Sequence, residues 1–227
     1  MTTNHQTTPT SQSSLPRIGD EAPDFTATTT HGELTFSEWQ GEDWVVLFSH
    51  PADFTPVCTT ELAAFASRQG EFTERGTKLI GVSIDSIHAH LAWTENIRQE
   101  LSVSVDYPLI ADLDQAVAQA FGLVHPGESS TATVRALFVI DPSRTVRALI
   151  YYPLNVGRNV DEVLRLVDAL QTASAHSVAL PVDWQPGEAV VVPPPKTLAD
   201  VEGRRQSEDE VLTFYLHKRP LEVATGA

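Results

Sequence analysis

The chemistry of this chain is centred on its single cysteine, Cys58. Cys58 closes the segment Thr55-Pro56-Val57-Cys58, and Thr followed by Pro is a helix-start signal with Thr as N-cap. Cys58 is therefore expected in the first turn of a helix, where the dipole favours an anion and backbone N–H groups lack intrahelical acceptors. Because a thiolate is the reactive form of cysteine, the segment predicts an activated nucleophile. The alternative is an inert core residue, as many lone cysteines are.

The helix start alone does not keep a thiol ionised at neutral pH. Moving the pKa of a cysteine from ~8.5 to about 6 takes roughly 3.4 kcal/mol, and a helix N-terminus supplies at most ~2 kcal/mol. We therefore expect a cation beside the sulfur. The candidates are Arg135, which opens an apolar run over residues 135–140, and Arg158. For both, the alternative is an ordinary surface arginine.

A longer stretch around the cysteine resembles a known family. The segment Ser49–Leu62, with its Pro51-x-x-x-Thr55-x-x-Cys58 spacing, is similar to the active-site loop of the peroxiredoxins, and within them of the one-cysteine subgroup. The similarity extends over roughly residues 18–220 and recurs at residues 135–142, 152–153, 157–159, 184–187 and 192–195.

The resemblance implies a thiol-dependent peroxidase acting on hydrogen peroxide and organic hydroperoxides. The Cys58 thiolate would attack a peroxide oxygen and become a sulfenic acid. With no second cysteine in the chain, an external thiol such as glutathione or thioredoxin would have to resolve it. The alternative function is a peroxide sensor or redox-switched chaperone that uses the same cysteine. A thioredoxin-like scaffold with a silent thiol is a third possibility.

The resemblance also implies roles for neighbouring residues. Thr55 and Arg135 join Cys58 as catalytic residues, because the departing oxygen needs hydrogen-bond donors fixed beforehand. A purely structural N-cap is the alternative for Thr55, since a capping hydroxyl would point at the backbone N–H of Cys58 itself.

Four further residues are expected to line the substrate pocket: Pro51, His50, Arg158 and Glu61. His50 could instead be a structural histidine, and favourable charge at a helix N-terminus would explain Glu61 without a function. We expect no metal site, because His88 and His90 lie two apart on a predicted helix and so on different faces. We also expect no cofactor.

The elements that must position Cys58 follow from hydrophobic periodicity. The apolar run Trp44–Phe48 predicts a buried strand, and helical spacing predicts a helix that continues to about Gly70. A βαβα half followed by a ββα half predicts an α/β, thioredoxin-like fold with a mixed central sheet flanked by helices. The other expected elements are a hairpin over 26–30 closed at 31–32, strands at 78–84, 135–140 and 145–152, a brief extended piece at 109–110, and helices at 87–98, 113–121 and 160–172.

Composition suggests three segments. Residues 1–15 read as a flexible leader, 16–173 as a thioredoxin-like domain and 174–227 as a small Pro-rich module, and the resemblance implies that 16–173 is the peroxidase domain. Within the module, the alternation of Leu212, Phe214 and Leu216 predicts a short strand. The resemblance implies that this module forms a homodimer, which could assemble further into a decamer-like ring of dimers.

Bulk properties exclude several classes of function. A net charge of -15 argues against binding nucleic acid or anionic membranes. One cysteine suits a reducing compartment, and no apolar run is long enough to span a membrane. Residues 1–14 lack the features of a secretory signal, so we expect a cytoplasmic protein.

Overall fold

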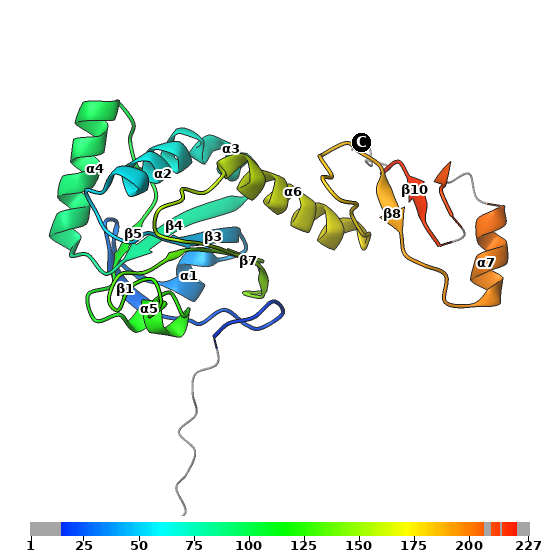
Figure 1. Ribbon diagram of the computed structural model, residues 1–227, viewed down its shortest axis with the longest axis horizontal. Coiled ribbons are helices and arrows are strands. Elements are labelled where there is room, and N and C mark those ends of the chain that lie inside the picture. The colour runs from blue at the N-terminus through cyan, green and yellow to red at the C-terminus, as the bar shows by residue number, and fades with distance from the viewer. Residues whose placement is uncertain (1–14, 207–209, 214, 222–227) are drawn as a thin grey trace, which may run out of the picture. The chain divides into compact units, whose positions relative to one another are not determined.

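The computed structural model describes residues 15–206, 210–213 and 215–221 (Figure 1). The chain divides into two compact units, residues 1–158 and 159–227. This division groups residues 160–172 with the second unit, whereas the boundary expected from the sequence groups them with the first. The expected leader lies almost wholly outside the described residues.

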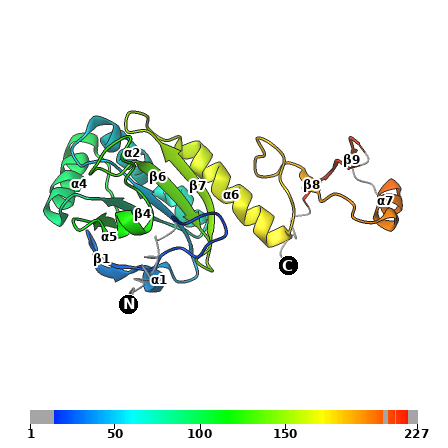
Figure 2. The ribbon, with the colours of Figure 1, turned by 60° about the horizontal axis from the view of Figure 1, so that its bottom comes forward.

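A seven-stranded mixed sheet forms the middle of the first unit (Figure 2). Its order is β2-β1-β5-β4-β3-β6-β7; β3, β4 and β5 run parallel, and the other neighbours pair antiparallel. The strands are β1 (Thr26–Thr29), β2 (Gly32–Thr35), β3 (Trp44–Ser49), β4 (Thr77–Ser83), β5 (Leu109–Ala111), β6 (Arg135–Ile140) and β7 (Val146–Tyr152).

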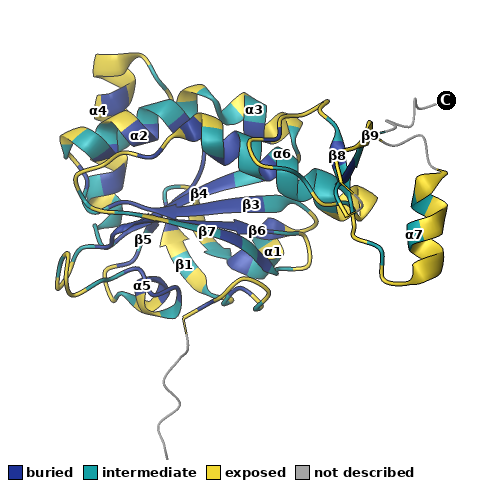
Figure 3. Ribbon diagram, turned by 45° about the vertical axis from the view of Figure 1, so that its right-hand side comes forward, coloured by how far each residue is buried: buried dark blue, intermediate teal, exposed yellow. Residues whose placement is uncertain are grey.

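Helices cover both faces of this sheet, as the thioredoxin-like prediction requires. In Figure 3, α2, α3 and α4 lie on one face, and α1 and α5 lie on the other. Their bounds are α1 (Phe36–Gln40), α2 (Pro56–Ser67), α3 (Gln69–Glu74), α4 (Ile87–Leu101) and α5 (Ala116–Ala120). The expected mixed sheet with flanking helices is confirmed.

Strand β3, which leads into the loop before α2, and its neighbour β6 are buried along almost their whole length. Every residue of β6 is buried, and so is β3 after Trp44. The ring of Phe48, at the end of β3, stacks on Phe65 of α2 with ring centroids 4.5 Å apart. This stacking fixes α2 against the strand that precedes the loop.

Several helix boundaries differ from those expected, and α4 and the helix from Val160 continue to Leu101 and His176, beyond the ends expected at residues 98 and 172. The helix after Cys58 ends at Ser67, and a second helix, α3, follows Arg68 and includes Gly70, which the sequence placed at the end of a single helix. Helix α5 begins at Ala116 rather than at residue 113. There the Asp112 carboxylate accepts hydrogen bonds from the backbone N–H groups of Val117 and Ala118, so the helix begins some residues after Asp112 rather than directly at residue 113.

The described residues of the second unit form two helices and a three-stranded sheet of order β8-β10-β9. Thr197 and Asp200 form a capping box at the start of its shorter helix. The sequence analysis described this segment only as Pro-rich and did not predict the helix. The predicted strand over Leu212–Leu216 is wrong at its described positions, which form the bend between β9 and β10; Phe214 lies outside the described residues. The elements are α6 (Val160–His176), β8 (Val190–Val192), α7 (Leu198–Arg205), β9 (Glu210–Val211) and β10 (His217–Arg219).

None of the described helices combines the length and hydropathy that crossing a bilayer would require.

Gly81, at the centre of β4, provides a test of this packing. A Cβ at this position would lie 2.6 Å from Leu109 Cδ2 and 3.5 Å from Phe48 Cζ. Because both neighbours are fully buried, we expect Gly81→Ala to lower the free energy of unfolding by about 1–3 kcal/mol. Gly70→Ala is the control: its Cβ meets nothing within 4 Å, and alanine favours a helix by up to ~1 kcal/mol. Urea unfolding measures both, and equal stabilities would contradict the prediction.

Candidate active site

Cys58 lies in the first turn of α2, as the start signal predicts. The helix begins at Pro56, Thr55 is its N-cap in an extended conformation, and Thr59 N–H donates the next backbone hydrogen bond to Thr55 O at 2.9 Å. The Cys58 thiol is free and fully buried. Burial fits the inert alternative as well as the active one, so the polar neighbours of the sulfur decide between them.

The hydroxyl of Thr55 does not cap the helix. It donates instead to the carbonyl of Ala52 at 2.9 Å, within the loop. The alternative that Thr55 is a side-chain N-cap is therefore wrong. With its proton committed to Ala52, the Thr55 oxygen is left as a hydrogen-bond acceptor.

Arg135, the first residue of β6, supplies the expected cation. Its Nη1 lies 3.4 Å from Cys58 Sγ and 2.6 Å from Glu61 Oε2. Its Nε and Nη2 both donate to the carbonyl of Leu154, at 3.0 and 2.7 Å. The guanidinium is thus held at three points while one N–H faces the sulfur. It is buried, so the surface-arginine alternative is wrong for Arg135.

Arg158 is also buried, but its bonds reach Glu61 rather than the sulfur. Its Nε and backbone N–H donate to Glu61 Oε1 at 2.7 and 2.8 Å, and its Nη2 donates to Oε2 at 2.9 Å. Its Nη1 donates to the carbonyl of Ala136, and the guanidinium lies over the rings of Phe48 and Phe65. Arg158 therefore contacts Glu61, which also bonds to Arg135.

The charges of this cluster leave one cation beside the cysteine. Burial alone would raise the pKa of Glu61, but the guanidinium groups of Arg158 and Arg135 hold that pKa below its ordinary value. Glu61 is therefore ionised and neutralises one of the two arginines. The remaining positive charge faces Cys58 through Arg135. Glu61 accepts four hydrogen bonds from Arg135 and Arg158, and a favourable charge at the helix start would not explain them.

His50 and Pro51 lie at the start of the loop, apart from this cluster. His50 Nε2 is 2.8 Å from Asp53 Oδ1, and Asp53 Oδ2 is 2.8 Å from His90 Nδ1. All three are buried. The sequence analysis did not single out Asp53, and it treated His90 only as half of an unlikely metal pair. The expected split of the histidine pair is confirmed, because His88 is exposed.

Among the described histidine, cysteine, aspartate and glutamate residues, His50, Asp53 and His90 form the group whose ligand atoms lie close enough together to surround a metal ion. Their N···O distances of 2.8 Å join the groups directly. This is the geometry of hydrogen bonds between the side chains. We interpret the trio as a proton-sharing network.

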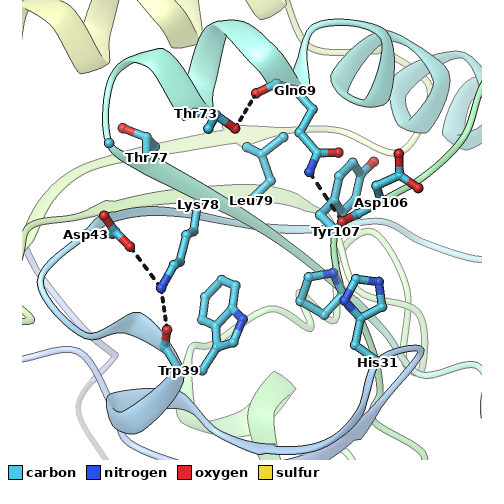
Figure 4. Close-up of a pocket in the computed structure, with 12 residues that line it drawn as sticks. His31, Trp39, Asp43, Gln69, Thr73, Thr77, Lys78, Leu79, Asp106 and Tyr107 are labelled. Carbon is cyan, nitrogen blue, oxygen red and sulfur yellow. Dashed lines mark hydrogen bonds and ion pairs between the residues drawn. The ribbon is translucent and has the colours of Figure 1, made fainter.

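A separate hollow of the first unit lies away from the predicted site (Figure 4). Lys78 spans part of it, contacting Asp43 and the carbonyl of Trp39, while Gln69 donates to the carbonyl of Asp106. It is lined by none of the residues that the sequence singled out as catalytic or pocket residues.

Comparison with known protein families finds a match in each of the two units of the chain. The model of the AhpC/TSA family matches residues 18–149, and that of the C-terminal domain of 1-Cys peroxiredoxin matches residues 169–208. A peroxiredoxin of Aquifex aeolicus is 50% identical over 216 residues, which cover 91% of this chain and 97% of that protein. A peroxiredoxin of Methanosarcina mazei is 48% identical over 202 residues, covering 86% of this chain and 92% of that protein.

Solved structures agree with the sequence comparisons. A yeast mitochondrial 1-Cys peroxiredoxin, studied for thiol resolution by the glutathione and thioredoxin systems, superposes with a TM-score of 0.83 at 39% identity, over 91% of this chain and all (100%) of that one. A mutant of peroxiredoxin 6 from Arenicola marina gives a TM-score of 0.81 at 38% identity, over 90% of this chain and 97% of that one.

The ion pairs of Glu61 predict a pH-dependent loss of stability on mutation. Glu61→Gln leaves two buried guanidinium groups without their carboxylate, and breaking a buried pair in this way lowers stability by about 3–5 kcal/mol. Because the folded-state pKa of Glu61 is lowered, its stabilisation is complete above the pKa of an unfolded glutamate, ~4.3, and is lost as the pH falls through the folded value. The deficit of Glu61→Gln should thus be largest near neutral pH and shrink in acid.

Urea unfolding at a series of pH values measures this deficit. The matched control is Glu95→Gln, because Glu95 is bound in the same two-pronged way by Arg98, but on the exposed face of α4. Solvent screens that pair, so its removal should have little effect. Equal losses in the two variants, or a Glu61→Gln deficit independent of pH, would refute the assignment.

Proposed function

Because this chain belongs to the AhpC/TSA family of peroxiredoxins and is a thiol-dependent peroxidase of the one-cysteine kind, we propose that Cys58 is the residue that peroxide oxidises. The substrates are hydrogen peroxide and organic hydroperoxides. The observation that carries this proposal is the hydrogen bond from Arg135 Nη1 to Cys58 Sγ at 3.4 Å. It supports a thiolate held beside a donor that can also meet the substrate.

In the proposed first step the Cys58 thiolate attacks the nearer peroxide oxygen. An S–O bond forms, the O–O bond breaks, and the departing alkoxide or hydroxide takes up a proton to give an alcohol or water. The Thr55 oxygen, an acceptor because its own proton goes to Ala52, receives the O–H of the incoming peroxide. Arg135 and the N–H of Cys58 stabilise the developing negative charge. Pro51 shields the reacting centre from water.

In the proposed second step an external thiol resolves the sulfenic acid. The thiol sulfur bonds to Cys58 Sγ, the S–O bond breaks, and the hydroxide leaves as water with the thiol proton. Another thiol then releases Cys58 from the mixed disulfide. Glutathione and thioredoxin are the candidate reductants, and the yeast relative was studied with both systems. The absence of a second cysteine supports an external donor.

We place the protein in the cytoplasm as a homodimer, with a ring of dimers as a larger assembly. The match of residues 169–208 to the C-terminal domain of 1-Cys peroxiredoxin supports the dimer. So do the exposed apolar side chains of the second unit, among them Val182, Leu198 and Leu212, since such surface is typically buried in an interface. We also propose that the functional domains follow the boundaries expected from the sequence, with residues 174–227 as the dimerisation module.

Turnover tests the function directly. With dithiothreitol as reductant, the wild-type protein should consume many equivalents of hydrogen peroxide, and Cys58→Ser should consume none. Mass spectrometry should find a sulfenic acid on Cys58 after peroxide, and a mixed disulfide when glutathione is added. A single stoichiometric oxidation without turnover would instead favour the sensor or redox-switched chaperone.

Thr55 variants test the proposed substrate contact. Thr55→Val keeps the shape but removes the oxygen, and we expect kcat/KM for hydrogen peroxide to fall about a hundredfold, as when one polar contact to the transition state is lost. Thr55→Ser keeps the oxygen and should stay within about fivefold of wild type. Stopped-flow peroxide consumption measures both. A Thr55→Val variant as active as Thr55→Ser would show that Thr55 does not contact the substrate.

A further inference from the structure

Asp53 ties the active-site loop, residues 51–55, to two other elements. Its Oδ1 lies 2.8 Å from Nε2 of His50, at the end of β3, and its Oδ2 lies 2.8 Å from Nδ1 of His90 on α4. Both histidine side chains are fully buried, and that of Asp53 is 2% exposed. The backbone N–H of Asp53 also donates to Asp85 Oδ2 at 3.0 Å. The middle of the loop is thus held by the side chain of Asp53 and, through its backbone, by Asp85.

The other bond of His90 reveals how many protons this bridge holds. His90 Nε2 lies 3.0 Å from the carbonyl oxygen of Ile110. A carbonyl can only accept, so Nε2 carries a proton. A neutral His90 would then present a bare Nδ1 lone pair to an oxygen of Asp53, and two acceptors do not bond. A proton must therefore lie between His90 Nδ1 and Asp53 Oδ2.

Burial and hydrogen bonding set the charge states of Asp53 and His50 in this bridge. Burial would raise the pKa of Asp53, but hydrogen bonds from His50 and His90 hold it below its ordinary value, so Asp53 is a carboxylate. Burial lowers the pKa of His50, so His50 is neutral and its single ring proton faces Asp53. The nearby carboxylate of Asp85 acts on His50 in the opposite sense and favours its protonated form. Each oxygen of Asp53 therefore faces a proton, one shared with His50 Nε2 and one shared with His90 Nδ1.

The sulfur of Cys58 has to become accessible to a thiol during catalysis. Cys58 is fully buried, yet resolution needs contact with the sulfur of an external thiol. Phe54, next to Asp53, has a positive φ of 54° and a side chain that is more than half exposed (56%). A phenylalanine in this conformation is strained, and the surrounding contacts have to maintain it. Opening the loop breaks both bonds of the Asp53 carboxylate.

We propose that Asp53 and His90 are positioning residues that latch the active-site loop in its peroxide-reactive arrangement, and that the latch holds one proton whose loss favours opening toward thiols. The inference rests on the proposed function of Cys58. The closed loop binds the shared proton, and the open loop releases it. The latch is therefore strongest at low pH and weakens as the pH rises through the loss of that proton.

Asparagine at position 53 separates the latch from its proton. Its amide N–H₂ can donate to the bare Nδ1 of a neutral His90, while its oxygen still accepts from His50 Nε2. Asp53→Asn should therefore close the loop without the extra proton, and Asp53→Ala should not close it at any pH. The control is Asp106→Asn, an exposed carboxylate bonded to Ser104.

The first experiment measures how fast iodoacetamide alkylates Cys58 between about pH 6 and about pH 10, a range that spans the titration of histidine. The ratio of wild-type to Asp53→Asn rates cancels the ionisation of the thiol itself. We expect this ratio to rise by up to about tenfold per pH unit, as for one linked proton. The ratio of Asp106→Asn to wild type should stay flat. At low pH, Cys58 should be alkylated faster in Asp53→Ala than in the wild type or in Asp53→Asn. Asp53→Ala should also lose at least about tenfold in kcat/KM for peroxide.

A wild-type to Asp53→Asn ratio that does not change with pH would overturn the proposal, because a merely structural Asp53 would give that result. The second experiment needs no variant: ¹⁵N NMR of histidine-labelled wild-type protein should find both ring nitrogens of His90 protonated near neutral pH. A His90 with a single ring proton would also overturn it. Both measurements are independent of turnover, so a protein that fails to reduce peroxide would refute the proposed function and leave the latch to be judged separately.

Discussion

The site depends on placing two guanidinium groups in the core of the protein next to one sulfur. A buried charge without a partner is strongly destabilising, so both arginines could not remain there alone. Glu61 solves this by accepting four hydrogen bonds from Arg135 and Arg158. It neutralises one positive charge and leaves the other for Cys58. Removing Glu61 would disturb stability and chemistry together, because the same carboxylate serves both.

The sheet brings these groups together from distant parts of the chain. Because β3 and β6 are antiparallel neighbours, the end of β3, from which the loop to Cys58 departs, lies beside the start of β6, where Arg135 stands. The chain then returns along β7 to the carbonyl of Leu154, which anchors the Arg135 guanidinium. A second buried network, centred on Asp53, holds the intervening loop. One network sets the charge at the sulfur, and the other sets the position of the loop around it.

Local sequence determined much of this protein. Thr55-Pro56 marks the start of α2 because proline is preorganised for the first helical position and needs no hydrogen-bond donor there. The alternating strands and helices predicted the mixed sheet, since periodicity reflects which face is buried. A helix N-terminus supplies less free energy than is needed to keep a thiol ionised at neutral pH, so the sequence predicted a cation near Cys58, with Arg135 as one of two candidates. These inferences succeeded because each depends on neighbouring residues or on composition.

Tertiary structure decided which partner each polar group takes. The hydroxyl of Thr55 could have capped the helix but bonds to Ala52 instead. Sequence offered Arg135 and Arg158 both as candidate cations, and the pairing of β6 with β3 places Arg135 against the sulfur, whereas Arg158 bonds to Glu61 without reaching the sulfur. Asp53 drew no attention because its partner His90 is 37 residues away. Sequence therefore determined the elements and the nucleophile, whereas long-range packing determined the hydrogen bonds, because burial compels each polar group to pair with whatever the fold brings near.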